Sequence, residues 1–327
     1  MPIDDRTIVI TGAAGFIGSC LVKHLNDKGF TNLVLVDDLG ISEKWQNLVL
    51  KQYIDILPIH ALPSWLVGRE TEIQAIIHLG ACSDTMEKDA SYLLENNYRY
   101  TLKLAEWALE NEVRFIYASS AATYGDGSKG FSDSHDLLPD LRPLNMYGHS
   151  KHLFDLWALR EGVLDTIVGL KYFNVFGPNE WHKGHMASAI VKFVNTINKE
   201  RKLTLFASSE PDKFKDGEQV RDFLYVKDAV VATAAFLDVP NGGIFNIGTG
   251  KAETWKSLAA ATFNALNLPE RIEFIPMPQD LLAKYQNYTK AEMAKAKSVI
   301  GKAADTRPLE TSVKDYVTNH LVNHSYW

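Results

Sequence analysis

Tyr147 and Lys151 are the two side chains of this 327-residue sequence whose types and spacing most directly indicate chemistry. Residues four apart on a helix share a face, so the lysine ammonium would lie beside the phenol. A phenol ordinarily titrates near ~10, and a nearby cation favours the phenolate and lowers that pKa. We therefore expect Tyr147 to exchange a proton with an alcohol near neutral pH. Because such pairs also occur in helices without function, the interpretation depends on a nucleotide site elsewhere in the chain.

A glycine-rich turn near the N-terminus predicts that nucleotide site. Gly12, Gly15 and Gly18 join a short apolar run to a helical pattern. Glycines at such a turn let the backbone approach a pyrophosphate, which then rests on the helix N-terminus. Asp37 closes the next apolar run, 19 residues after Gly18 (37 − 18), at the position of a ribose-binding acid. Together these features predict dinucleotide binding.

These residues leave the identity of the dinucleotide open. An acid at Asp37 favours the free 2′-hydroxyl of NAD. Lys44, seven residues later, could instead contact the 2′-phosphate of NADP. A lone lysine in a polar loop is most often simply solvated, so Lys44 decides little by itself.

Ser120 adds a second hydroxyl group to the expected chemistry. It follows a predicted strand at residues 114–118 and would lie at the carboxyl edge of a parallel sheet, where ligands bind. A serine there can hydrogen-bond the same substrate alcohol as Tyr147. Considered alone, Ser120 could equally well cap a turn.

The elements that must position these residues alternate between strand and helix patterns through the first half of the chain. The predicted strands are residues 7–10, 33–36, 75–78, 114–118 and 167–172, and the predicted helices are residues 16–28, 97–109 and 150–160. This alternation indicates a parallel sheet covered on both faces. After about residue 174 the pattern changes to a helix at 187–199 and strands at 203–206, 223–226, 244–247 and 272–275.

We therefore expect an α/β fold, a Rossmann-type doubly wound parallel sheet with a smaller α/β substrate-binding lobe. Residues 1–172 and about 222–248 should form the dinucleotide-binding domain. Residues 173–221 and about 249–327 should form the substrate-binding lobe, interleaved with the first domain.

Composition excludes several other classes of function. The net charge of −6 gives no reason to expect nucleic-acid binding. Two cysteines, Cys20 and Cys82, are too few for a disulfide framework and fit a reducing compartment. No apolar stretch approaches membrane-spanning length, and the N-terminus lacks the pattern of a signal peptide. We expect a cytoplasmic protein with no membrane partner.

The glycine turn, Ser120, Tyr147 and Lys151 stand in the order found in the extended short-chain dehydrogenase/reductase family, which the sequence resembles. The second half narrows the resemblance. Residues 172–178 (YFNVFGP) are similar to a segment of nucleotide-sugar epimerases and dehydratases. The chain resembles the ADP-glycero-manno-heptose 6-epimerases in further segments, namely residues 78–83 (HLGACS), 96–98 (NNY), 119–125 (SSAATYG), 182–188 (HKGHMAS) and 221–223 (RDF).

The resemblance implies a reaction in lipopolysaccharide inner-core precursor biosynthesis. ADP-D-glycero-beta-D-manno-heptose would be converted to its L-glycero epimer by transient oxidation to a 6-keto sugar, with hydride returned on the opposite face. Inversion requires proton exchange on two faces, and the family implies Tyr147 for one face and Lys183 for the other. A lysine can act as a base when desolvation lowers its pKa. The family also implies NADP rather than NAD, with Lys44 at the 2′-phosphate, and a homo-oligomer, a pentamer.

The resemblance also assigns individual site residues. The implied catalytic set is Tyr147, Lys183, Lys151 and Ser120. The implied cofactor-binding set is Gly12, Gly15, Phe16, Ile17, Gly18, Asp37, Asp38, Lys44, Leu79, Gly80, Ala81, Cys82, Ser83, Asn97, Tyr147, Lys151, Val175 and Lys183. The implied substrate-binding set is Ser120, Asn174, His185, Lys192, Phe206, Ala207, Ser208, Ser209, Arg221 and Tyr285, with Arg221 suited to a bidentate pyrophosphate contact.

Two other functions remain as alternatives. One is a different nucleotide-sugar epimerase or a dehydratase of the same fold, although a dehydratase would place an Asp-Glu pair where this chain has Ala121, Ala122 and Thr123. The other is a catalytically silent dinucleotide-binding regulator, which the intact Tyr147–Lys151 pair disfavours. We expect no metal, because no carboxylate or cysteine completes the His-x2-His spacing of His182 and His185.

Overall fold

The computed structural model, which describes residues 6–279 and 286–327, is built around one seven-stranded parallel sheet. Its strands in spatial order are β11 (Gly243–Ile247), β6 (Val168–Tyr172), β5 (Arg114–Ser120), β4 (Ile73–His78), β1 (Thr7–Thr11), β2 (Leu33–Val36) and β3 (Asp55–Leu57). The chain runs from β1 outward to β3 and then returns to place β4 on the other side of β1. This reversal creates a switch point, where ligands bind in doubly wound sheets.

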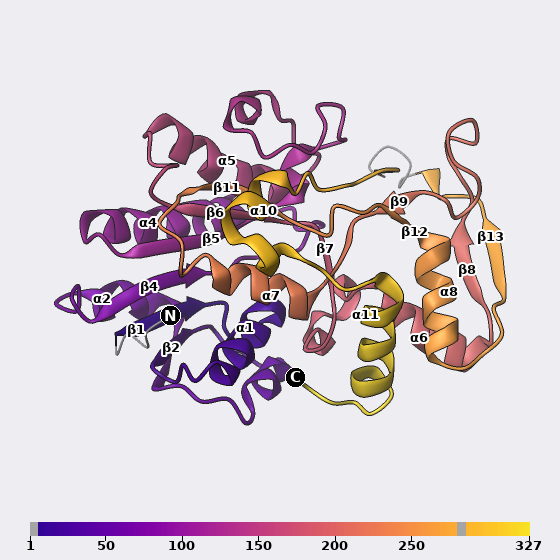
Figure 1. The fold of residues 1–327 in the computed structure, drawn as a ribbon, viewed down its shortest axis with the longest axis horizontal. Helices are drawn as coiled ribbons and strands as arrows, with labels where there is room; N and C mark the ends of the chain where they lie inside the picture. Colours follow the sequence, from indigo (N-terminus) through magenta and orange to yellow (C-terminus); the bar gives the residue numbers. More distant parts are fainter. Residues whose placement is uncertain (1–5, 280–285) are drawn as a thin grey trace.

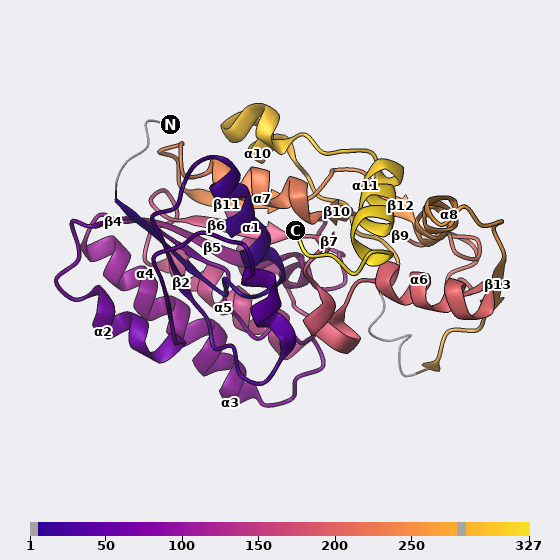
Figure 2. The same cartoon turned by 90° about the horizontal axis from the view of Figure 1, so that it is seen from below.

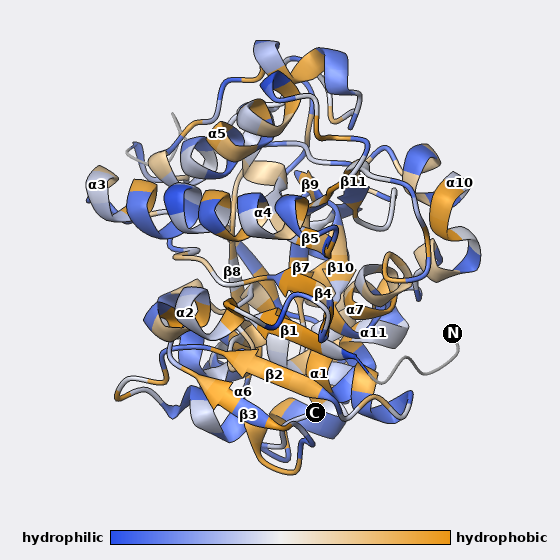
Figure 3. Cartoon of the chain, turned by 90° about the vertical axis from the view of Figure 1, so that its left-hand side faces the viewer, coloured by the Kyte–Doolittle hydropathy of each residue, from blue (hydrophilic) through white to orange (hydrophobic). Residues whose placement is uncertain are grey.

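Helices cover both faces of the sheet, as the alternating pattern predicts (Figures 1 and 2). One face carries α1 (Phe16–Asp27) and α7 (Val226–Ala235), which pack against each other, and the other carries α4 (Tyr100–Glu110) and α5 (Met146–Arg160). The short helices α2 (Leu62–Leu66) and α3 (Ala90–Leu93) lie within the connections. The strands are almost continuously apolar because both of their faces are buried (Figure 3).

A smaller group of elements extends from one end of the sheet (Figure 1). It contains α6 (Ala189–Glu200), α8 (Trp255–Ala265), α11 (Leu309–Tyr316) and the parallel pair β8 (Leu203–Phe206) and β13 (Ile272–Ile275). Two further pairs join it to the main sheet region: β7 (Asn174–Phe176) with β10 (Phe223–Tyr225), and β9 (Val220–Arg221) with β12 (Glu253–Thr254). Helix α10 (Ala294–Ile300) instead packs beside β11 of the main sheet.

Short segments of 3-10 or π helix are the remaining helical elements of the described residues. They are η1 (Glu43–Leu48), η2 (Ile59–Ala61), η3 (Leu94–Arg99), η4 (Ala121–Tyr124), η5 (His135–Asp140), η6 (Trp181–Met186), η7 (Gly301–Ala304) and η8 (Val317–Leu321). Within the two described ranges, none of the helices combines the length and the apolar character needed to cross a membrane.

The predicted fold class is confirmed, with differences at individual elements. Strands β2, β8 and β13 have the predicted bounds, whereas β3 and the two-residue or three-residue strands β7, β9 and β12 were not predicted. Helix α5 begins at Met146 rather than residue 150, because Asn145 caps it by accepting a hydrogen bond from the Gly148 amide at 2.8 Å. The predicted division into two domains stays a prediction.

Candidate active site

The predicted site residues of the first half lie at the carboxyl edge of the main sheet. The glycine turn follows β1, Asp37 follows β2, the segment of residues 79–83 follows β4, and Ser120 ends β5. Because all these strands are parallel, their carboxyl ends meet at one edge. The fold therefore brings together residues that are more than 100 positions apart in sequence.

The glycine turn has the close backbone packing that a dinucleotide site requires. Gly12 adopts a φ of +67°, and a Cβ built there would lie 2.6 Å from the Cα of Gly80. A Cβ on Gly18 would lie 2.1 Å from the carbonyl oxygen of Gly12. Gly15, in extended conformation, precedes the first turn of α1. The turn can therefore present the N-terminal amides of α1 to a pyrophosphate, and Phe16 and Ile17 begin that helix.

Asp37 and Lys44 form an ion pair beside this turn. The Lys44 Nζ lies 2.6 Å from Asp37 Oδ1, and Asp37 Oδ2 accepts a hydrogen bond from the Ala14 amide at 2.9 Å. Asp37 is buried, whereas Asp38 is exposed and accepts a hydrogen bond from the Ile59 amide. The predicted ribose acid is thus neutralised by the predicted phosphate contact.

The segment of residues 79–83 is held by Asn97, which the resemblance also placed in the cofactor site. Asn97 is buried in η3, and its Oδ1 accepts a hydrogen bond from the Cys82 amide at 2.9 Å. Its Nδ2 donates to the Cys82 carbonyl at 2.9 Å and to Ser150 Oγ at 3.0 Å. Asn97 therefore connects the loop after β4 to α5. A cofactor-facing role of Leu79, Gly80, Ala81, Cys82 and Ser83 stays a prediction.

Tyr147 and Lys151 both lie on α5, next to Ser120. Gly148 permits this approach, since a Cβ there would be 2.8 Å from the Ala122 carbonyl oxygen. Burial raises the pKa of Tyr147, and a hydrogen bond with Ser120 opposes that rise. Burial also lowers the pKa of Lys151 to about 8, against the opposing charge of Asp155. The expectation that Tyr147 has a lowered pKa is therefore wrong for the chain by itself, because desolvation outweighs the hydrogen bond with Ser120.

A buried ion pair that the sequence did not reveal lies one helical turn beyond Lys151. Asp155 and Lys171 are both fully buried, and their Oδ2 and Nζ atoms are 2.6 Å apart. Asp155 also accepts hydrogen bonds from Tyr117 at 2.9 Å and from Ser119 at 2.8 Å. Lys171 donates to Thr123 Oγ1 at 2.6 Å. This network joins α5 to β5, β6 and η4, so it fixes the helix that carries Tyr147.

His78 is another buried polar residue near the edge, and it has a structural role. Its ring nitrogens contact Thr11 Oγ1 at 2.6 Å and Thr101 Oγ1 at 2.8 Å. Burial lowers the pKa of His78 to about 3, so the ring is neutral at physiological pH. These two contacts make His78 a hydrogen-bonded core histidine.

Lys183 comes to the same region from the opposite half of the chain. It lies in η6, and its Nζ is 5.0 Å from the centre of the Phe16 ring, at the start of α1. Burial lowers the pKa of Lys183, and the charge of Glu180 opposes that decrease. Nearby, the Nδ2 of Asn47 donates to His182 Nδ1 at 3.2 Å and to the Ala14 carbonyl at 2.9 Å. The segment around Lys183 is thereby attached to the glycine turn.

Two of the predicted substrate segments, residues 207–209 and Arg221, lie on either side of Asn287, whose carbonyl accepts a hydrogen bond from the Val220 amide at 3.0 Å. Ala207, Ser208 and Ser209 follow β8, and Ser209 Oγ lies 3.5 Å from Asn287 Oδ1. Arg221 is buried in β9, 5.9 Å from the Trp255 ring, and β9 pairs with residues near Tyr288.

Four other predicted residues lie within strands or a helix. Asn174 of β7 accepts a 3.5 Å hydrogen bond from Thr289. Phe206 ends β8 and Val175 lies within β7. Lys192 lies on α6 with an exposed side chain.

The last two predicted substrate residues are His185 and Tyr285. His185 lies in η6, exposed, with its Nε2 3.3 Å from Asp84 Oδ2, in the loop after β4. This places it near the nucleotide edge of the sheet. Tyr285 lies outside the described residues. In the part of the chain that is described, no group of three or more His, Cys, Asp or Glu side chains could hold a metal ion.

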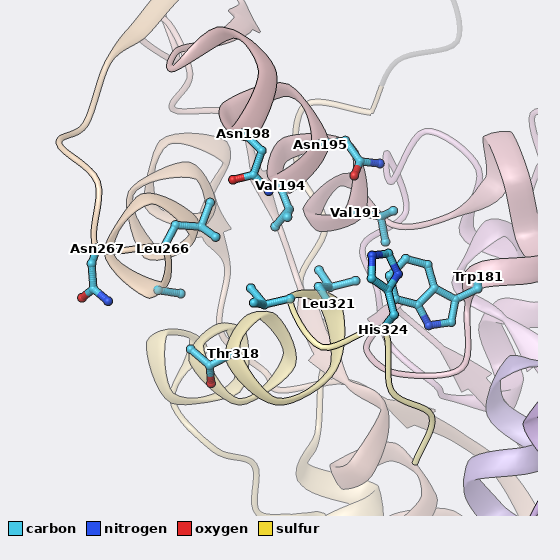
Figure 4. A pocket seen from close by; sticks show the side chains of 12 residues that line it. Trp181, Val191, Val194, Asn195, Asn198, Leu266, Asn267, Thr318, Leu321 and His324 are labelled. Carbon is cyan, nitrogen blue, oxygen red and sulfur yellow. The ribbon is translucent and has the colours of Figure 1, made fainter.

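A surface hollow of about 460 Å³ lies beside Trp181 of η6 (Figure 4). Trp181 and His324 stack at one end of it, with ring centres 5.1 Å apart. Residues of α6, α8 and η8 line the rest, and none of them belongs to the predicted site. The hollow therefore shares Trp181 with the segment that carries Lys183 but is separate from the candidate active site.

Comparison with known proteins gives a consistent result. The model of the "NAD dependent epimerase/dehydratase family" matches residues 8–248. ADP-L-glycero-D-manno-heptose-6-epimerase of Nitratidesulfovibrio vulgaris (strain Hildenborough) is 48% identical over 316 residues, covering 96% of this chain and 97% of the relative.

Solved structures agree. The Helicobacter pylori protein of the same name has a TM-score of 0.80 at 27% identity, covering 96% of both chains. UDP-glucuronic acid 4-epimerase of Bacillus cereus, solved with UDP-glucuronic acid and NAD, has a TM-score of 0.76 at 25% identity, covering 96% of this chain and 99% of that one.

Proposed function

The chain belongs to the NAD dependent epimerase/dehydratase family, and we propose that it epimerises C6 of ADP-D-glycero-beta-D-manno-heptose to the L-glycero form. The observation that carries the proposal is that two candidate proton-transfer groups lie along one carboxyl edge of the sheet, at the end of β5 and at the glycine turn after β1. Tyr147 of α5 lies beside Ser120, which ends β5, and Lys183 of η6 lies over Phe16 at the start of α1. The near full-length likeness to the Nitratidesulfovibrio enzyme supports this particular sugar.

The proposed reaction requires one residue for each face of the substrate carbon. A nicotinamide dinucleotide held by the glycine turn would supply the hydride acceptor and donor for C6. Tyr147, oriented by Ser120, takes or gives the hydroxyl proton on one face, and Lys183 does so on the other. Lys151 would stabilise the phenolate of Tyr147 and would hold the nicotinamide ribose. Each turnover oxidises C6 to a ketone and reduces it again, so no external oxidant is consumed.

The ion pair between Asp37 and Lys44 supports NADP as the cofactor. A bare carboxylate at the ribose would repel a 2′-phosphate, but Lys44 neutralises it at 2.6 Å and is itself partly exposed. Lys44 can then contact the phosphate with its remaining donors. The site therefore fits either dinucleotide, and the cation favours NADP.

The proposed biological role is synthesis of the lipopolysaccharide inner-core precursor, in the cytoplasm, by a homo-oligomer. Family resemblance supports a pentamer. Arg221, Asn174 and the segment of residues 206–209 are proposed to bind the ADP-sugar, with Arg221 at the pyrophosphate. His185 and Lys192 are proposed to contact it from η6 and α6.

The test is incubation of the purified chain with ADP-D-glycero-beta-D-manno-heptose, followed by NMR of the C6 configuration. We expect a mixture of both C6 epimers at equilibrium. An unchanged C6 centre, with inversion of another nucleotide sugar, would move the function to a different epimerase. Denaturing the protein and identifying the released dinucleotide tests the cofactor, and release of NAD alone would contradict the NADP proposal.

A further inference from the structure

The loop of residues 177–188, which carries Lys183, is closed at its base by one buried carboxylate. Glu180 is 1% exposed. Its Oε2 accepts a hydrogen bond from the Ser188 amide at 2.6 Å, and its Oε1 accepts one from Ser188 Oγ at 2.6 Å. The Gly177 amide also donates to Oε1, at 3.5 Å. Both ends of the loop thus meet on the same side chain.

Glu180 also connects this loop to the rest of the molecule. Tyr316 of α11 donates its hydroxyl proton to Glu180 Oε1 at 2.8 Å, across 136 positions of sequence. The Glu180 backbone carbonyl accepts a hydrogen bond from the Lys183 amide at 3.0 Å. A carboxylate that accepts four hydrogen bonds from three segments defines the position of all of them.

The backbone between these anchor points would not hold one shape unaided. Gly184, directly after Lys183, has a φ of +54°, and Asn179 has a φ of +72°. For Asn179, which carries a Cβ, this conformation costs free energy unless surrounding contacts fix it, whereas Gly184 is free to adopt other conformations. The loop therefore depends on its base for the position of the Lys183 side chain.

We infer that Glu180 is the positioning residue for Lys183, closing the 177–188 loop three positions before it and holding a buried negative charge within the backbone turn that leads to Lys183. The inference rests on the proposed function in giving Lys183 a proton-transfer role. Further charged or titratable groups around this segment include Tyr316, Cys20, His182, the Asp37–Lys44 pair and the His185–Asp84 pair. The charge of Glu180 raises the pKa of Lys183 and so opposes the effect of burial.

The experiment is the pH dependence of Lys183 acetylation by acetic anhydride, followed by mass spectrometry of the modified peptide. Only the neutral amine reacts, so the midpoint reports the pKa of Lys183 without any substrate. Glu180→Gln keeps the shape and removes the charge. We expect the midpoint to fall by roughly half a unit to one unit, because a nearby opposite charge favours the ammonium form.

Two variants separate charge from loop closure. Ser188→Ala removes one hydrogen bond but keeps the Glu180 charge, so its midpoint should stay at the wild-type value. Asp228→Asn neutralises a similarly buried carboxylate, which instead pairs with Arg307 and accepts its amide at 2.9 Å. The midpoint should not move in Asp228→Asn. An unchanged midpoint in Glu180→Gln, or an equal fall in Asp228→Asn, would overturn the inference.

Activity provides the second readout. Glu180→Gln should lower kcat about 10-fold and Glu180→Ala about 100-fold, the size expected when a reacting group is displaced by about 1 Å. The pH at which kcat is half-maximal should shift in Glu180→Gln in the same direction as the acetylation midpoint. A wild-type chain that failed to invert C6 would refute the proposed function, whereas the acetylation result would still decide the position and charge of Lys183.

Discussion

The two segments that carry the candidate proton-transfer residues are built in opposite ways. Tyr147 lies in the first turn of a 15-residue helix, which is capped by Asn145 and fixed to the sheet through the fully buried pair Asp155–Lys171. Lys183 lies in an irregular loop whose conformation depends on Glu180. The first segment is part of the core, whereas the second is attached to it. We infer that the loop is the adjustable half of the site.

Removing either proton-transfer group should have the largest effect on activity. Tyr147→Phe and Lys183→Ala should each lower kcat by roughly 10²–10⁴-fold, the usual contribution of general acid–base catalysis. C6 epimerisation followed by NMR measures the loss, and thermal unfolding checks that the fold is retained. Near-normal turnover in either variant would show that the two segments do not share the chemistry.

Stability should distinguish the two segments next. Lys171→Met leaves the Asp155 carboxylate buried without its cation, so the free energy of unfolding should fall by about 3–5 kcal/mol. Glu180→Gln should lower it by less, because the loop can open without disturbing the sheet. Urea denaturation of both variants makes the comparison. Lys202→Met, which breaks an exposed pair with Glu273, is the control and should unfold like the wild type.

Acid should produce the smallest and most local difference. Burial lowers the pKa of His152 on α5 and of His182 in η6 to about 4, from an ordinary value near ~6.5. Opening lets each ring take up a proton below pH ~6.5, so the stabilisation from the neutral rings is complete above that pH and is lost as the pH falls toward 4.

Because the loop opens more easily than the helix, the amide hydrogen exchange rate of residues 181–187 should rise at a higher pH than that of α5 as the pH is lowered. Exchange rates are corrected for the intrinsic effect of pH. His182→Gln should reduce this acid sensitivity in the loop and leave that of α5 unchanged. Simultaneous opening of both segments would mean that they form a single cooperative unit.

The sequence predicted the strands with clear apolar runs and missed the elements that need distant partners. β2 and β8 match their predicted bounds because turn residues limit both runs. β7 and β9 are two or three residues long and form only by pairing with β10 and β12. Such short pairings leave no periodic signal.

In the candidate site, too, the residues that depend on distant partners were the ones that the sequence missed. Lys171 gave no indication in sequence that it is fully buried and paired with Asp155, although Asp155 follows Lys151 by one helical turn. Glu180 is a single acid in a loop rich in glycine, proline and histidine, and its partner Tyr316 is 136 positions away.

The sequence by itself determined the parts of this protein that depend on local geometry. Glycine spacing determines the turn after β1, and helical periodicity places Tyr147 and Lys151 on one face. Only the tertiary structure decided how these groups titrate and what holds them. Desolvation depends on everything that packs around a side chain, which is why burial raises the pKa of Tyr147 although a lysine follows it by one turn. For the same reason, the position of Lys183 follows from Glu180 and Phe16, which only the folded chain brings to it.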